Sequence, residues 1–176
     1  MTIYATHIDL VDASDGQLVA DLARGSGGKM TYRDTVDTVA DLSGITSPAD
    51  DDVAGVRADG LLYHYSGSAW GTLEAYRLDQ ALQHASSLVD ASVAQKKVIP
   101  LSPVPTVIVG CVVDIALFRL GAPEWKDRND AAQRIIASLQ RGTLSFGLSD
   151  DGDAPGGIDT VEWNSTASIM GDDSFI

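Results

Sequence analysis

The stretch VIPLSPVPTVIVGCVVDIALFRLG, residues 98–121, is the feature that most constrains how this chain can fold. Over residues 106–119 all but four side chains are hydrophobic. A helix that is apolar on every side must be covered on every side. We therefore expect a central helix over about 105–120, with Pro105 in its first turn and Gly121 at its end.

Two amphipathic segments flank this stretch and can each cover one side of it. Apolar residues recur three and four positions apart in both segments, which predicts helices over 76–93 and about 123–141. In the first helix the predicted buried stripe is Leu78, Ala81, Leu82, Ala85, Leu88, Val89 and Ser92. In the second helix the predicted inner face is Ala131, Ala132, Ile135, Ile136 and Leu139.

The central helix also carries two charged residues, Asp114 and Arg119, which lie about 140° apart around its axis. They cannot pair with each other, so each is expected to reach a partner elsewhere or to lie near the rim. Asp114 and three prolines interrupt the apolar run, which therefore does not read as a membrane span. The candidate core and interface residues of this helix are Val109, Val112, Val113, Asp114, Phe118 and Arg119.

Residues 1–24 are expected to form two short helices. Thr6, with Asp9 three residues later, gives a weaker form of the capping box. Ser14 or Asp15 restarts a helix that ends at Gly25. The N-terminal helices or a neighbouring subunit would close what remains uncovered of the central helix.

Residues 25–73 differ in character and are expected to form an inserted β module after a flexible GSGG hinge. Asp59-Gly60 lies between two strand-like runs, which predicts a hairpin with a type I′ turn within about 35–73. Because a lone hairpin is marginal in water, a third strand or docking onto the helices is expected. Trp70 would cover the small sheet, and packing is favoured over base stacking for Tyr63, Tyr65 and Trp70.

Residues 143–176 lose helical periodicity, and no Lys or Arg follows Arg141. Such an acidic stretch cannot build its own core, so we expect an extended arm that a partner orders. Its candidate interaction residues are Leu144, Phe146, Leu148, Ile158, Val161, Trp163 and Phe175. The predicted fold is α+β and mainly α: a helical core from 1–24 and 74–142, the module at 25–73, and the arm.

Motifs that carry chemistry are missing from the sequence. The three histidines lie on separate segments and Cys111 is the only cysteine, so zinc is poorly supported. Asp151 and Asp153 alternate in SDDGD, but the ligand spacing of a calcium loop is incomplete. No phosphate loop and no nucleophile elbow is present. We expect no catalytic, cofactor or metal site, and no enzyme.

The net charge of −13 repels polyanions at long range, which disfavours a role in binding duplex DNA. Two rival functions remain open. An acidic inhibitor that mimics DNA would need carboxylates at phosphate-like spacing on ordered elements, and a competition assay against a DNA-binding enzyme would reveal it. A small helical domain that binds a ligand or catalyses a reaction would need a polar pocket.

Several short motifs in a fixed order resemble the Mu-type phage family of small head–tail connector, or neck, proteins. They are a Tyr-Ala opening at Tyr4, a "PL…VP" turn at 100–105, and a helix with Asp114-Ile115-Ala116 and Arg119-Leu120. Gly142 with Leu144, Gly147 and Leu148 resembles the family's exit from its last helix. The resemblance covers 1–24 and 74–176, whereas 25–73 resembles small β modules of phage tail proteins.

The resemblance implies a structural virion protein without catalytic residues. It would form a ring of copies of itself beneath the portal, twelvefold as in related adaptor rings, and would receive the stopper or tail. DNA would pass through the channel without specific binding, and no membrane would be involved. The location would be the virion neck, and the host cytoplasm during assembly.

Overall fold

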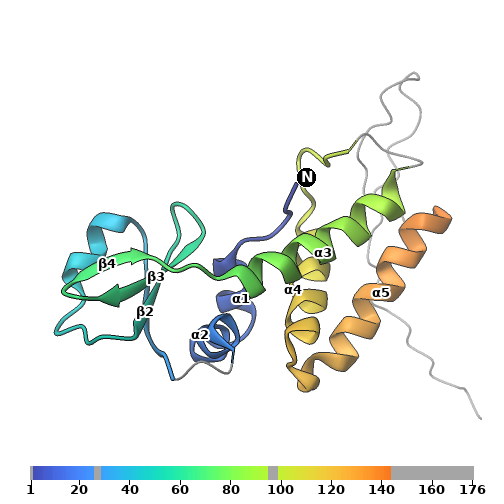
Figure 1. Cartoon of the computed structure of the whole chain (residues 1–176). Coiled ribbons are helices and arrows are strands. Elements are labelled where there is room, and N and C mark those ends of the chain that lie inside the picture. Colours follow the sequence, from blue (N-terminus) through green and yellow to red (C-terminus); the bar gives the residue numbers. More distant parts are fainter. Residues whose placement is uncertain (1, 26–28, 95–98, 144–176) are drawn as a thin grey trace, which may run out of the picture. The chain divides into compact units, whose positions relative to one another are not determined.

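The computed structural model describes residues 2–25, 29–94 and 99–143 (Figure 1). Its helices are α1 (His7–Ala13), α2 (Gly16–Arg24), α3 (Tyr76–Val93), α4 (Thr106–Leu120) and α5 (Lys126–Arg141), with short 3-10 helices η1 (Val39–Gly44) and η2 (Pro123–Trp125). Its strands are β1 (Thr31–Val36), β2 (Asp52–Val56), β3 (Leu61–Ser66) and β4 (Ala69–Thr72). This mixed α/β fold, mostly helical, confirms the predicted fold class. Residues 144–176, which contain nearly all of the predicted arm, lie outside the described part.

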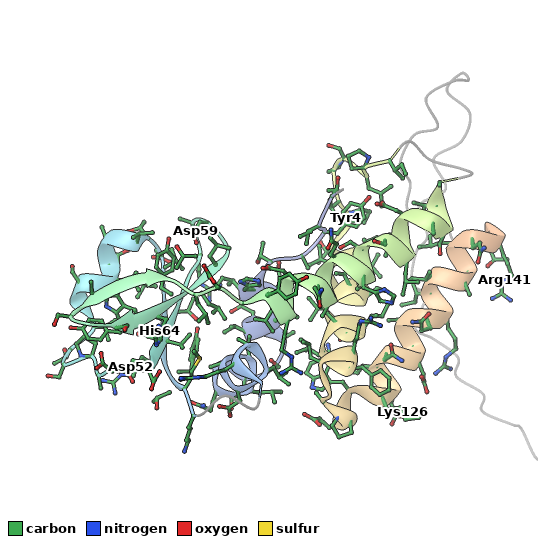
Figure 2. The ribbon with its side chains drawn as sticks, viewed as in Figure 1. Tyr4, Asp52, Asp59, His64, Lys126 and Arg141 are labelled. Carbon is green, nitrogen blue, oxygen red and sulfur yellow. The ribbon has the colours of Figure 1, made fainter. Side chains whose placement is uncertain are left out.

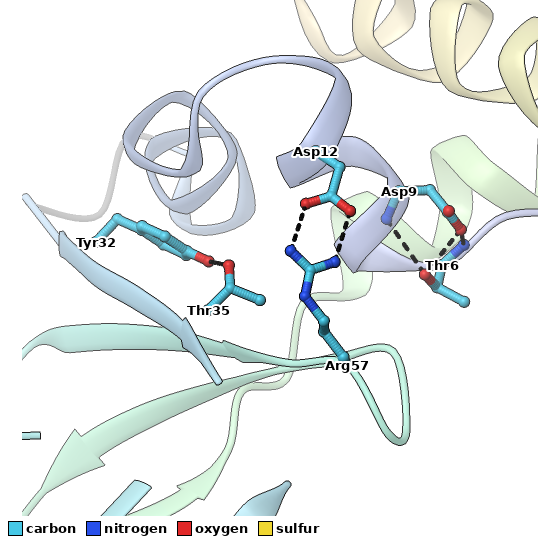
Figure 3. Close-up of polar contacts among 6 residues, drawn as sticks. All are labelled: Thr6, Asp9, Asp12, Tyr32, Thr35 and Arg57. Atoms are coloured by element: carbon cyan, nitrogen blue, oxygen red, sulfur yellow. Dashed lines mark hydrogen bonds and ion pairs between the residues drawn. The ribbon is translucent and has the colours of Figure 1, made fainter. Parts of the chain in front are cut away.

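Local signals set the helix ends much as the sequence predicts. Thr6 and Asp9 form a reciprocal capping box at the start of α1 (Figure 3). Asp15 caps α2, which ends at Gly25. Gly121 and Gly142 end α4 and α5 in the left-handed conformation that glycine adopts at little cost. These five helix boundaries are therefore set by residues at or next to the helix ends.

The apolar helix α4 lies between α3 and α5, and α1 also contacts it (Figure 1). The predicted stripe of α3 is buried at five positions, whereas Leu88 and Ser92 are only half-buried. On α5 the inner face is narrower than predicted, because Ala131 is exposed and Ile135 is half-buried. The flanking helices thus cover α4 as expected, with one predicted contact residue facing water.

The strands form one sheet in the order β1-β2-β3-β4. The predicted hairpin is β2 and β3, which pair antiparallel, and β4 continues from β3 in the same way. The sheet begins at Thr31, earlier than the predicted 35, because β1 adds to β2 as a parallel edge strand. The expectation of at least a third strand is confirmed by a fourth one.

The hairpin turn differs from the two-residue type I′ turn predicted at Asp59-Gly60. Four residues separate β2 from β3, and of these only Gly60 has a positive φ, +74°. The Asp59 side chain accepts hydrogen bonds from the Leu61 amide and the Tyr63 hydroxyl, and so holds the longer turn. A Cβ on Gly60 would lie 2.7 Å from Thr6, so this turn packs directly against the start of α1.

The inner strand β2 is covered on both faces of the sheet. On one face Ala54 and Val56 pack with Leu42 of η1, and Trp70 lies against them as predicted. The opposite face holds Leu62, which is fully buried, and meets α1. Because a small sheet with a strand buried on both faces cannot stand alone in water, the β module is docked onto the N-terminal helices.

Ion pairs and a backbone hydrogen bond reinforce this docking. Arg57, just after β2, donates two hydrogen bonds to the Asp12 carboxylate of α1, at 2.7 and 3.1 Å (Figure 3). The His7 amide donates to the Gly60 carbonyl at 3.1 Å. Arg24 of α2 lies 2.6 Å from Asp51, and this guanidinium lowers the pKa of that carboxyl.

A buried tyrosine near the N-terminus fastens three parts of the helical region together. Tyr4 donates its amide to Ser86 Oγ at 3.1 Å and its hydroxyl to Asp90, both on α3. The same hydroxyl accepts the Leu101 amide at 3.2 Å, in the segment that leads into α4. Figure 2 shows Tyr4 between α3 and that segment. Burial raises the pKa of Tyr4, which keeps the hydroxyl available as a donor.

We predict that Tyr4→Phe destabilises the protein by about 1–3 kcal/mol, because it leaves the buried Leu101 amide without an acceptor. Urea unfolding followed by circular dichroism measures this loss. Tyr76→Phe is the matched control, since the Tyr76 side chain is 69% exposed. Equal stability of the two variants would contradict the role given to Tyr4.

Candidate interaction surface

One side of α4 is left open by the described helices. Val107 and Phe118 are 38% and 37% exposed, and Gly110 is exposed between them. These residues, with Asp114, recur three and four positions apart and therefore lie on one face of the helix. The Asp114 side chain is only 16% exposed, because Arg128 of α5 lies against it. We call Val107, Gly110, Asp114 and Phe118 the open strip. The rest of the helix surface is largely buried, through Ile108, Cys111, Val112, Val113, Ile115, Ala116, Leu117 and Leu120.

Gly110 makes the middle of the open strip unusually low. A Cβ built on this residue meets no other atom within 4 Å, apart from the backbone of its own helix. Glycine inside an exposed helix weakens the helix by roughly 1 kcal/mol relative to alanine. A small residue flanked by two large apolar ones also lets another element approach the helix backbone closely. The strip is therefore a shallow apolar surface that is lowest at Gly110.

Asp114 is the one charged residue of the open strip, and it has a partner within the chain. Arg128 Nη2 of α5 lies 2.9 Å from Asp114 Oδ1. Burial raises the pKa of Asp114, and the guanidinium opposes that shift. Arg128 in turn stacks over the Trp125 ring, with 4.1 Å between the guanidinium carbon and the ring centroid. The pair ties α4 to α5 and neutralises the strip.

The candidate residues of α4 separate into two groups. Val112 and Val113 are buried within the chain itself, and Val109 is half-buried. Phe118 and Arg119 are exposed. Asp114 and Arg119 do not face each other, as predicted. The first group therefore belongs to the core of one copy, and the second remains available for contacts.

Sequence reasoning missed the open strip, Arg128 and Trp125. Gly110 is one of the four residues that interrupt the hydrophobic run over 106–119, and its spacing from Val107 and Phe118 is the sequence signal for the strip. The candidate residues Leu144, Phe146, Leu148, Ile158, Val161, Trp163 and Phe175 lie outside the described residues. So do Asp151 and Asp153, the carboxylates considered for calcium.

The histidines and the cysteine are separated in space as well as in sequence. His7 Nε2 lies 2.8 Å from Asp79, and His64 Nε2 lies 3.3 Å from Asp51. Over residues 2–25, 29–94 and 99–143, no three His, Cys, Asp or Glu side chains are grouped so that they could hold a metal ion. Within the same residues, no helix has the length and apolar character needed to cross a membrane.

Comparison with known protein families decides the broad identity of the chain. A family model described as Bacteriophage Mu, Gp36 matches residues 4–163. The chain belongs to this family. No curated protein matches the chain.

Membership of the Mu Gp36 family makes this a Mu-type bacteriophage protein. The match confirms the phage part of the resemblance seen in the sequence. Its range also includes residues 25–73, which departed from the resemblance. Two motifs of that resemblance meet in the Gp36-family fold, since Tyr4 of the opening bonds to Leu101 of the "PL" turn.

Cys111 of this Gp36-family protein gives a test of how tightly α4 is enclosed. Burial, with a smaller contribution from Asp114, raises the pKa of the thiol to about 11. At pH values below the ordinary pKa of a thiol, Cys111 is protonated in both the folded and the unfolded chain, so its ionisation makes no difference to stability. As the pH rises from that value towards 11, the unfolded chain loses the proton first, so stability falls.

We therefore predict that the wild-type free energy of unfolding falls more steeply between pH 9 and about 11 than that of Cys111→Ala. Denaturant unfolding at several pH values measures both slopes, and the variant controls for tyrosine and lysine titration. Parallel curves, or fast reaction of the folded wild type with a thiol reagent at pH 8, would show that α4 opens readily to water.

Proposed function

We propose that this protein is a structural component of the phage particle, a head–tail connector that assembles as a ring beneath the portal. The ring would extend the DNA channel towards the stopper or tail proteins. Family membership supports the phage setting. The observation that carries the connector role is the open strip of α4, an exposed apolar surface on a helix that is otherwise largely buried.

The open strip favours a neighbouring copy as its cover. Val107, Gly110 and Phe118 offer apolar area and a close approach to the helix backbone. Asp114 is already paired with Arg128, so covering it leaves no unpaired charge at the contact. A heterologous contact between identical copies closes into a ring when the rotation between them fits.

The charge of the chain suits a channel for DNA. At −13 the protein repels the phosphate backbone, which lets DNA pass without adhering to the wall. A DNA mimic is less well supported, because several carboxylates of the described residues are paired with basic side chains rather than displayed in an array. These are Asp12, Asp51, Asp114 and Asp130.

The direct test is the mass of the purified protein alone and with the portal protein of the same phage. Native mass spectrometry and electron microscopy should show a ring that co-assembles with the portal, with twelve copies expected from the resemblance. A protein that stays monomeric at every concentration, with and without portal, would overturn the connector proposal.

We predict that Phe118→Asp abolishes ring formation while the monomer keeps its helical circular dichroism signal. The reason is that a charge in the open strip must be desolvated when the neighbouring copy docks. Val39→Asp is the matched control, because Val39 is 48% exposed and lies in η1, away from α4. Equal loss of assembly in both variants would show that the effect is not specific to the open strip.

We also predict that Gly110→Ala stabilises a single copy of the protein but weakens its assembly into a ring. The monomer should gain roughly 1 kcal/mol, because alanine favours the helix and meets no atom in its own chain. Assembly should weaken, because an extra methyl group in a close contact costs about 1–3 kcal/mol. Denaturant unfolding measures the stability of the monomer, and sedimentation measures assembly. A gain in both would show that the neighbouring copy does not contact Gly110.

A further inference from the structure

We propose that a groove between α3 and α4 binds an acidic segment of another protein. This α3–α4 groove has a volume of about 530 Å³ and lies where the last turn of α4 passes α3. Arg77, Gln80 and His84 line it from α3, and Arg119 lines it from α4. The site is distinct from the open strip, and nothing in the proposed connector role assigns it a ligand.

The sign of the charge in the α3–α4 groove is opposite to that of the chain. The whole sequence has 25 acidic and 12 basic residues, yet the described residues that line the groove include two arginines and a histidine and no carboxylate. Residues 74–141 hold eight of the twelve Lys and Arg but only seven of the acidic residues. A cationic groove in an acidic protein attracts anionic groups and steers them to one place.

The two groove arginines are available for a ligand in a way that most other arginines are not. Ion pairs with carboxylates already engage Arg24, Arg33, Arg57 and Arg128. Arg119 is exposed and forms no ion pair with any residue in the described part of the chain. Arg77 donates one hydrogen bond to the Leu22 carbonyl at 3.2 Å, which orients its guanidinium and leaves other N–H groups for a ligand.

The chemistry of the groove favours carboxylates on a peptide over the backbone of duplex DNA. A guanidinium can bind either group through two parallel hydrogen bonds. A duplex, however, would lay many phosphates over surrounding acidic surface, and the net charge of −13 opposes that. A peptide brings only a few charges to one groove, and the Gln80 amide can both donate to and accept from its backbone.

A labelled acidic peptide tests this proposal by fluorescence anisotropy with the full chain. The sequence of residues 149–173 is a suitable probe, because it has seven carboxylates and no Lys or Arg. We expect saturable binding that weakens as salt is raised. A matched peptide with amides in place of the seven carboxylates should not bind.

Arg119→Glu should weaken peptide binding about five- to tenfold, since it replaces an attraction with a repulsion at an exposed site. Arg141→Glu is the matched control, because it makes the same charge change on an exposed arginine at the far end of α5 (Figure 2). It should leave binding within about twofold of wild type.

Three results would overturn the proposal: no binding of the acidic peptide, equal loss in the two variants, or binding of a labelled DNA duplex that depends on Arg119. The last result would assign the groove to phosphates instead. The assay reads peptide binding and not ring formation. If the protein binds the peptide but forms no ring, only the connector role is disproved. If it forms a ring but does not bind the peptide, only the proposed ligand of the groove is disproved.

Discussion

The structure depends on the enclosure of α4. Its hydrophobic side chains project in nearly every direction, and leaving them in water would cost more free energy than a small domain can spare. Helices α3 and α5 take two sides and α1 contributes a third, so these elements are held together by what they jointly cover. The prolines before α4 and Gly121 after it let the chain reverse at both ends. The bundle follows from this one requirement.

The rest of the described chain is connected to the helices around α4 through a series of contacts. Tyr4 holds the N-terminal segment against α3 and against the entrance to α4. That segment leads into α1, and α1 in turn is the surface on which the hairpin turn and β2 rest, through Gly60 and the Arg57–Asp12 pair. The sheet therefore depends on α1, and α1 contributes to the cover of α4, so the β module is coupled to the helical core by packing.

Sequence reasoning located the elements that are set by local signals. Thr6, Asp15, Gly121 and Gly142 act on their own helix ends, so their roles can be read from the sequence. The parallel strand β1 and the four-residue turn depend on tertiary contacts that no local pattern encodes. The same holds for the pairing of Asp114 with Arg128 and for the joining of Arg77 to Arg119 in one groove. The apolar run predicted that α4 is buried, but not which strip of it stays open.

Helix α4 carries both of the surfaces proposed for contacts, and its geometry keeps them apart. Successive residues are about 100° apart around a helix, so Arg119 points away from the open strip that ends at Phe118. The strip is apolar and neutralised, whereas the groove is cationic, so the two surfaces select different chemistry. One copy can then hold two different partners on opposite sides of a single helix. A ring of identical copies that also docks onto other proteins needs subunits with such separate surfaces.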